Sequence, residues 1–281
     1  MTLVLVLALS LVVGVALGAL GGGGSILTVP ILVYVAGLDA KEAIATSLLV
    51  VGTTSAVGAV THARAGRIRW RTGAVFGLGG MVGAFVGGLV AGHLPGRLLL
   101  TAFATMMIAT AVAMLRGPRV APAAGELRVA RALVDGVVVG LLTGLVGAGG
   151  GFLVVPALVL LGGLPMSVAV GTSLVVIAMK SAAGLAGYLT TVSIPWDLAL
   201  PVTAVAICGT VVGGRLTGRI PEDRLRALFG WFVLVIGTFV LLEQAAPSSW
   251  LLPGVLVLAV VALALGGRAW VERPRSVTGR S

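Results

Sequence analysis

Charge is scarce in this chain. Only 10% of its 281 residues are Asp, Glu, Lys or Arg, whereas a soluble domain carries about 25%. Hydrophobic residues make up 58% of the sequence, and the mean hydropathy is +1.16. Because so little charge cannot cover a water-exposed surface, the composition excludes a soluble globular protein. It predicts an integral membrane protein that consists of one membrane domain.

Residues that bind metals or act as catalysts are also scarce. The single cysteine, Cys208, excludes an internal disulfide and a cysteine metal cluster, and we interpret it as a small packing residue in an apolar run. There are two histidines, and we interpret His62, beside an arginine-rich loop, as solvated. The chain contains neither paired carboxylates within its apolar segments nor a GxxxxGK[ST] phosphate loop. These absences argue against an enzyme, a primary pump and a cofactor.

The sequence repeats itself after 126 residues without a gap. Pro30 falls on Pro156 and Trp70 falls on Trp196, and several polar residues hold the same register. Chance matching of apolar residues would not align prolines, tryptophans and Thr-Ser pairs together, so we infer a duplication. The expected organisation is a first transmembrane repeat at 1–115, a cytoplasmic linker at 116–130, a second repeat at 131–243, an added C-terminal helix at 249–267 and a basic cytoplasmic tail at 268–281.

Each half carries a glycine cluster between apolar runs, within residues 18–30 and 144–156. Glycine in a helix interior costs roughly 1 kcal/mol relative to alanine, so each cluster predicts a break in a helix. The apolar runs that follow, 25–38 and 150–163, would reach only about 21 Å as helices, whereas the hydrocarbon core is about 30 Å thick. We therefore expect a broken hairpin with a half-helix or re-entrant segment in each half.

The basic residues decide between two topologies. If each glycine cluster separates an entering helix from a returning one, sixteen of the nineteen Lys and Arg residues fall on one side of the membrane. If each glycine segment crosses once, they divide nearly evenly, against the positive-inside rule. The first topology inverts one half relative to the other, and equivalent loops then differ in charge, as the basic 64–71 and the uncharged 190–193 do.

This topology predicts a multi-pass protein of the cytoplasmic (inner) membrane, with its N-terminus outside and its C-terminus in the cytoplasm. It also accounts for the net charge of +10, because the basic residues lie in cytoplasmic loops. We therefore do not interpret that charge as a nucleic-acid-binding surface.

The glycine clusters are candidate anion sites. A helix N-terminus carries unpaired N–H groups and a partial positive charge, and we expect Ser25 and Phe152 to open the returning half-helices. In this interpretation the clusters meet near the midplane. In the alternative, the glycines only permit close helix packing. The candidate substrate-binding residues here are Gly22, Gly23, Gly24, Ser25, Gly149, Gly150 and Gly151.

Two hydroxyl pairs and one lysine complete the candidate site. Thr46-Ser47 and Thr172-Ser173 lie near the starts of the next helices, where their hydroxyls either bind an oxyanion or bond to the carbonyl four residues back. Lys180 is the only charged residue well inside an apolar segment. Its amine pairs with an anionic substrate, carries a proton, or snorkels to the membrane interface.

These motifs resemble the TauE/SafE-type family of sulfite and organosulfonate exporters. The resemblance rests on the G-x-x-G-x-G-G-G-x-x-x-x-P element at 144–156, its first copy at 18–30, A-x-x-T-S-L at 43–48 and 169–174, and the basic loop that ends in Arg67-Ile68-Arg69-Trp70. It covers about residues 5–245. It implies a multi-pass carrier of sulfur-containing or small organic anions such as sulfite, sulfonates or sulfoacetate, driven by ion gradients.

Together these features predict an all-helical polytopic membrane protein of two inverted repeats, each with a glycine-broken hairpin, plus one extra C-terminal helix. We expect a secondary transporter that exports small, sulfur-containing anions across the lipid bilayer. Proton coupling is favoured over sodium coupling because no carboxylate faces the expected site. The alternatives are a passive anion channel and a non-transporting membrane scaffold or enzyme subunit.

Overall fold

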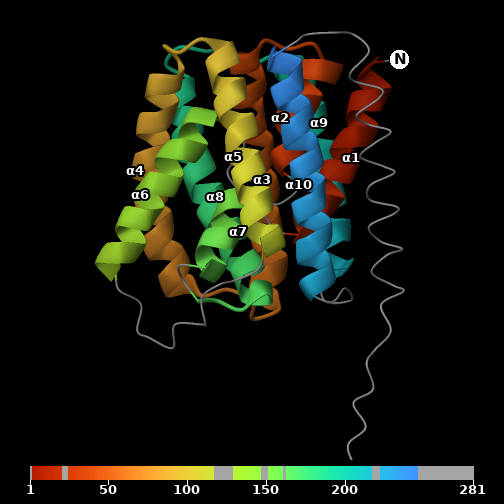
Figure 1. Ribbon diagram of the computed structural model, residues 1–281. Helices are drawn as coiled ribbons and strands as arrows, with labels where there is room; N and C mark the ends of the chain where they lie inside the picture. Colours follow the sequence, from red (N-terminus) through yellow and green to blue (C-terminus); the bar gives the residue numbers. More distant parts are fainter. Residues whose placement is uncertain are drawn as a thin grey trace, which may run out of the picture.

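The computed structural model describes residues 2–20, 25–116, 129–146, 151–160, 163–216 and 222–245. Within these ranges the chain forms helices joined by short turns, with no strand (Figure 1). The helices are α1 (Thr2–Leu20), α2 (Thr28–Pro30) with its π-helical continuation η2 (Ile31–Val35), α3 (Ala40–Arg64), α4 (Trp70–Ala91), α5 (Gly96–Arg116), α6 (Val129–Val146), α7 (Gly151–Leu160), α8 (Met166–Tyr188), α9 (Trp196–Leu216) and α10 (Glu222–Ala245). The predicted helix at 249–267, the tail and most of the linker lie outside the described residues.

Five of the described helices, α3, α4, α6, α8 and α9, are long and apolar enough to cross a membrane. Large apolar side chains cover the outer surface. Val82, Val134 and Leu200 are 59–61% exposed, which suits contact with lipid rather than water. The prediction of an all-helical, multi-pass membrane protein is therefore confirmed.

Helices α4 and α6 run parallel in backbone contact. A Cβ atom added to Gly83 would run into the carbonyl of Val137, and one added to Gly87 would run into that of Leu141. Each partner lies 54 residues after its glycine, so the two helices run in the same direction. Helix α8 lies against α4 in that direction too, through the pairs Gly73–Thr172, Gly80–Lys180 and Gly88–Gly187.

Helices α9 and α1 repeat the contacts of α4 and α6 at positions that differ by 126 residues. A Cβ atom added to Gly209 would run into the carbonyl of Leu11, and one added to Gly213 would run into that of Val15. Helix α3 runs parallel to α9 through the pairs Gly58–Thr210 and Thr61–Gly214. We call α4, α6 and α8 the second-half bundle, after α6 and α8, and α1, α3 and α9 the first-half bundle.

The two bundles meet where α3 crosses α8, and there the helices run antiparallel. A Cβ atom added to Gly52 would lie 3.2 Å from Cβ of Ser181, and one added to Gly58 would lie 3.3 Å from Cδ1 of Leu174. As residue numbers rise along α3 they fall along α8. The bundles therefore point in opposite directions, and their contact is made by side chains rather than by interlocked backbones.

Arginine side chains gather at one end of the helices. At the end where α3 and α9 finish and where α4, α6 and α8 begin lie Arg64, Arg67, Arg69, Arg71, Arg131 and Arg215. The other end holds Arg97, which donates to the carbonyl of Gln244 at 3.0 Å, and Lys41, which donates to the carbonyl of Gly92 at 2.7 Å. The described structure thus has one strongly basic end.

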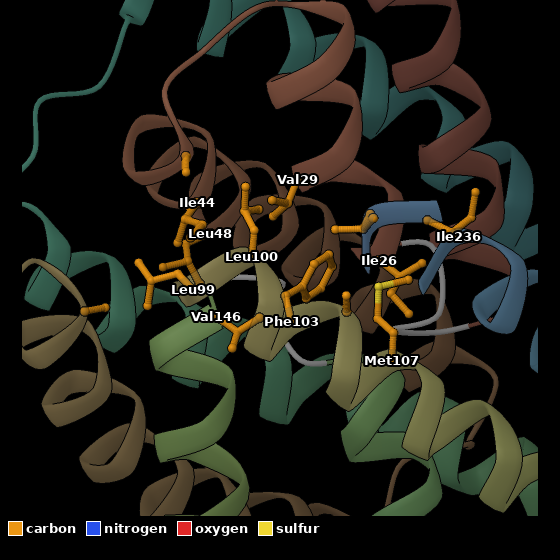
Figure 2. Packing of buried hydrophobic residues seen from close by; sticks show 14 of the residues in the cluster. Ile26, Val29, Ile44, Leu48, Leu99, Leu100, Phe103, Met107, Val146 and Ile236 are labelled. Atoms are coloured by element: carbon orange, nitrogen blue, oxygen red, sulfur yellow. The ribbon is translucent and has the colours of Figure 1, made fainter. Parts of the chain in front are cut away.

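Helix α5 packs against the segments next to both glycine clusters. Figure 2 shows Phe103 and Met107 of α5 in a buried apolar cluster with Val29, Val146 and Ile236. Val29 follows the first glycine cluster, and Val146 ends α6 just before the second. Both hairpins are therefore held against one shared core.

The backbone contacts make a stability prediction. Gly83→Ala or Gly209→Ala forces a methyl group into a neighbouring carbonyl, and overpacking of this kind costs about 1–3 kcal/mol. Gly184→Ala is the matched control, because the atoms nearest its added Cβ lie 3.5–3.6 Å away. Thermal unfolding of detergent-purified protein should show lower melting temperatures for the first two variants only. Equal melting temperatures for all three would contradict the contact geometry.

Candidate functional site

The centres of the glycine clusters are outside the described part of the chain. The predicted site residues in that position are Gly22, Gly23, Gly24, Gly149 and Gly150. Their role in anion binding therefore stays a prediction. Ser25 is buried and starts the segment that returns from the first cluster. Gly151 is buried and starts α7, one residue before the Phe152 that the sequence suggested.

The first glycine of each element has a packing role. A Cβ atom added to Gly18 would run into the carbonyl of Thr210, and one added to Gly144 would run into that of Ala84. Thr210 and Ala84 are themselves 126 residues apart. At these two positions the packing interpretation of the glycines is correct.

The returning segments are short, as predicted. They end at Val35 and Leu160, and each is followed by a glycine with positive φ, +73° at Gly37 and +62° at Gly163. The amide of the next leucine then donates to the carbonyl six residues earlier, at 3.0 Å in the first half and 3.1 Å in the second. The same turn therefore sets the length of both segments.

The two predicted hydroxyl pairs behave differently. The Thr172 hydroxyl accepts the backbone N–H of Arg69 at 3.0 Å, and the Ser173 hydroxyl donates to the carbonyl of Val170 at 2.7 Å. In contrast, the hydroxyls of Thr46 and Ser47 are buried and have no hydrogen-bond partner in the described structure. The first-half pair is therefore available to a ligand, whereas the second-half pair serves the fold.

A single residue explains the difference between the two threonines. The position 126 residues after Arg69 is Pro195, and proline has no backbone N–H. The turn before α9 therefore lacks the donor that the turn before α4 offers to Thr172. Burying a hydroxyl without a partner lowers stability by about 1–3 kcal/mol. The Thr46 hydroxyl therefore does not stabilise the fold, which suggests another role for it.

Lys180 lies inside the protein, and the snorkelling alternative is wrong. The residue is 1% exposed, and its amine donates to the Thr143 hydroxyl at 3.0 Å. Thr143 in turn donates to the carbonyl of Gly140 at 3.2 Å. The amine is held between helices because α8 packs on α3, α4 and α6, and so it does not reach the membrane surface. An ammonium at the bilayer centre costs at least about 2.5 kcal/mol, so this position favours a functional role.

A small closed pocket lies beside Lys180. Its lining residues are Leu48, Ala84, Thr143, Gly144, Lys180 and Ser181. Residues from α3, α4, α6 and α8 thus converge, and one of them, Gly144, opens the second glycine element. The pocket lies at the contact between the two bundles.

Serines that the sequence analysis did not select lie at this contact. The Ser181 hydroxyl lines the Lys180 pocket, and the Ser55 hydroxyl lies 126 residues earlier in the sequence. Both are buried and neither has a partner in the described residues. The repeated Ser-Ala pairs at 55–56 and 181–182 are the signal in the sequence that could have found them. Nothing in the sequence marked Thr143, whose partner lies 37 residues away.

His62 and Tyr188 occupy equivalent positions beside the helix that precedes each glycine cluster. The Tyr188 hydroxyl donates to the carbonyl of Leu145 at 2.8 Å, near the end of α6. His62 is 1% exposed and interacts with the backbone of Gly18 near the end of α1, so the prediction of a solvated histidine is wrong. The error arose because the sequence does not show that α1 packs beside the end of α3.

The predicted packing residue Cys208 lies at the surface. Cys208 is exposed on α9, so it faces outward and does not pack in the interior as predicted.

A cavity of about 10 Å³ lies between α1, α2, η2, α3 and α9, with the hydroxyls of Ser10 and Thr28 in its lining. This volume is near the minimum that holds one water molecule. Within the described ranges, no group of three His, Cys, Asp or Glu side chains is placed to hold a metal ion.

Comparison with known proteins places these features in a class. Residues 6–240 match the family described as "Sulfite exporter TauE/SafE". A probable membrane transporter protein of Xylella fastidiosa is 34% identical over 243 residues, which cover 82% of this chain and 91% of the relative. One from Methanocaldococcus jannaschii is 30% identical over 260 residues, covering 85% and 96%. One from Bacillus subtilis is 27% identical over 229 residues, covering 79% and 94%.

The helical fold and these relatives define a multi-pass membrane transporter. The chain belongs to the sulfite exporter TauE/SafE family, as its duplicated glycine elements suggested. No solved structure matches it.

The two threonines provide a matched test. Thr172→Val leaves the N–H of Arg69 without its acceptor, and loss of this part-buried hydrogen bond costs about 1 kcal/mol of stability. Thr46→Val removes no hydrogen bond of the described structure, so its melting temperature should equal that of the wild type. If the Thr46 hydroxyl binds substrate, Thr46→Val instead lowers transport several-fold. The hydroxyl assignment would be overturned by a Thr46→Val protein that loses as much stability as Thr172→Val.

Proposed function

We propose that this protein is a secondary transporter that exports a small sulfur-containing anion, bound between two inverted halves. The observation that carries the proposal is the position of Lys180, a buried amine at the contact of two antiparallel bundles. A cation held within a membrane domain attracts an anion. The family description supplies the sulfur chemistry, because it names sulfite.

Inverted duplication is supported by helix direction and by register. Each bundle is held by glycine contacts that recur 126 residues along the chain, such as Gly83–Val137 and Gly209–Leu11. The bundles run in opposite directions where α3 crosses α8. Two copies of one bundle that point in opposite directions are related by an axis in the membrane plane, as in many secondary transporters.

The basic end supports an orientation in the inner membrane. Arginines concentrate where α3 and α9 end, and the positive-inside rule assigns that end to the cytoplasm. The N-terminus, at the start of α1, then lies outside, because α1 runs parallel to α3 and α9.

Cysteine labelling tests the orientation. In a Cys208→Ala background, Arg69→Cys and Arg215→Cys should react with an impermeant thiol reagent from the cytoplasmic face only. His93→Cys should react from the outer face only, because the turn at 92–95 lies at the opposite end of α4. Reaction of Arg69→Cys and Arg215→Cys from different faces would exclude the inverted topology.

The anion site combines charge and hydroxyl donors. Lys180 supplies the positive charge, and Ser181 supplies a hydroxyl in the same pocket. Ser55, Thr46 and Ser47 add buried hydroxyls from α3 that have no partner in the described structure. The oxygens of sulfite or a sulfonate accept such donors, and the N–H groups of the glycine clusters would add to them.

Movement of the bundles provides access from each side in turn. Contacts of α1 with α9 and of α4 with α6 put backbone against backbone and leave no room to slide, as at Gly213 and Gly87, whereas α3 meets α9 through threonine side chains. Contacts between the bundles involve side chains, as at Gly52–Ser181 and Gly58–Leu174. We therefore assign the movement to the α3–α8 crossing, where one rigid bundle rocks against the other around the Lys180 pocket.

Transport by purified protein in liposomes tests the proposal. Sulfite, thiosulfate, isethionate and sulfoacetate form the panel, with chloride as a control anion. A carrier shows saturable uptake of at least one sulfur anion, and anion on the opposite side accelerates that uptake. Uptake that rises linearly with concentration and shows no counter-exchange would indicate a channel instead, and no movement of any sulfur anion would indicate a protein that does not transport them.

Glycine variants test the part of the site assigned to the clusters. Gly150→Leu should lower transport at least tenfold while the protein still inserts and purifies, because a side chain there blocks approach of the anion. Gly66→Asn is the control, since Gly66 lies in an exposed turn with φ of +67° and open space, a conformation that asparagine tolerates. Normal transport by Gly150→Leu would remove the cluster from the site.

A further inference from the structure

The Lys180 amine has more hydrogen-bond donors than its surroundings accept. A protonated amine carries three N–H donors. In the described structure one acceptor, the Thr143 hydroxyl, receives a bond from it, at 3.0 Å. The other pocket walls include the apolar Leu48 and Ala84, and the pocket leaves no space for a water molecule. This environment suits a neutral amine in the closed, empty protein.

The helices that pack on α8 bring no negative charge to the pocket. In the described structure these helices are α3, α4, α6 and α7, and α7 has no charged residue. The titratable and charged residues of the other three are Lys41, Glu42, His62, Arg64, Arg71, Arg131 and Asp135, and α8 itself adds Tyr188. None of them lines the pocket. Asp135 lies eight residues before Thr143 on α6, about 12 Å along the helix axis.

We propose that Lys180 is the proton carrier of this transporter and takes up one proton each time an anion binds. The inference rests on the proposed function. The neutral amine, one proton and one monoanion combine to form an ammonium–anion pair. When the anion leaves on the other side, the proton leaves with it and the amine returns to its neutral form. No carboxylate of the described helices lines the pocket and competes with the anion for the ammonium, so charge in the pocket is balanced only when both are bound or both are absent.

Coupling follows from this balance. The loaded and the empty pocket each carry no net charge, whereas a pocket with only the proton or only the anion holds a buried charge that resists bundle movement. One monoanion and one proton therefore move together in the same direction. The cycle is electroneutral, so the pH gradient and the anion gradient together set its direction and a membrane potential does not. Export then takes place when the internal anion concentration is high enough to exceed an opposing pH gradient.

The first half of the chain serves as an internal reference. The position 126 residues before Lys180 is Thr54, whose hydroxyl donates to the carbonyl of Val50 at 2.6 Å. A threonine there cannot carry a proton across. The duplication therefore leaves one proton carrier per chain, and we expect one proton per monoanion.

Isethionate is the probe for the test, because this sulfonate stays a monoanion throughout the neutral pH range. Liposomes with wild-type protein should accumulate it against its gradient when a pH gradient is imposed and the potential is clamped at zero with valinomycin. A potential without a pH gradient should give no accumulation. Accumulation driven by the potential alone would overturn the proton coupling while leaving anion transport intact.

Two substitutions assign the proton to Lys180. Lys180→Arg keeps a permanent positive charge, so the empty protein holds an unbalanced cation and its return is slowed. Net uptake should fall at least tenfold, while exchange of internal for external isethionate continues. That exchange also shows that the variant folds. Lys180→Gln carries no proton, so its remaining uptake should respond to membrane potential and no longer to the pH gradient.

Lys41→Arg is the matched control, because Lys41 is the only other lysine and lies at the end of the bundle. Its net uptake should equal that of the wild type. Lys180→Arg with full pH-driven uptake, or Lys180→Gln with intact proton coupling, would overturn the role of Lys180. If the wild type carries no anion of the panel, including isethionate, the proposed function fails and this inference fails with it.

Discussion

The structure depends on close backbone contact between parallel helices. In a membrane there is no hydrophobic force between helices, because lipid tails are as apolar as leucine side chains. Association then depends on packing, and glycine lets backbones approach most closely. The pairs Gly83–Val137 and Gly209–Leu11 show this directly, since a single added carbon would run into a carbonyl. Such contacts hold α1 to α9 and α4 to α6, which is why we propose that movement takes place at the α3–α8 contact between the bundles.

That surface also holds the polar groups. The pocket beside the α3–α8 crossing is lined by Lys180 and Ser181 of α8, Thr143 of α6 and Leu48 of α3, and the hydroxyl of Ser55 on α3 has no partner in the described structure. Buried polar groups without partners reduce stability. Ser181 and Ser55 lie on α8 and α3, the two helices that cross between the bundles, and this is the reason to assign their hydroxyls to an anion that visits the pocket. In this account the glycine contacts hold the helices of each bundle together, and the polar side chains bind the transported anion.

Sequence alone predicted much of this fold. The 126-residue register, the short returning segments and the all-helical membrane fold could all be read from residue patterns. The roles of single side chains could not, because they depend on residues distant in sequence. The Thr172 hydroxyl accepts a hydrogen bond from the backbone N–H of Arg69, 103 residues away, whereas the Thr46 hydroxyl has no partner in the described structure. The burial of His62 depends on α1, and the burial of Lys180 on α6.

A reversible cross-link between the bundles tests the central claim most directly. A Cβ atom at position 52 lies 3.2 Å from Cβ of Ser181, close to the span of a disulfide. Gly52→Cys with Ser181→Cys, in a Cys208→Ala background, should form a disulfide on oxidation and join α3 to α8. If the bundles must move against each other, anion transport stops on oxidation and returns on reduction in the same protein. Equal transport by the oxidised and reduced forms would contradict movement at this contact.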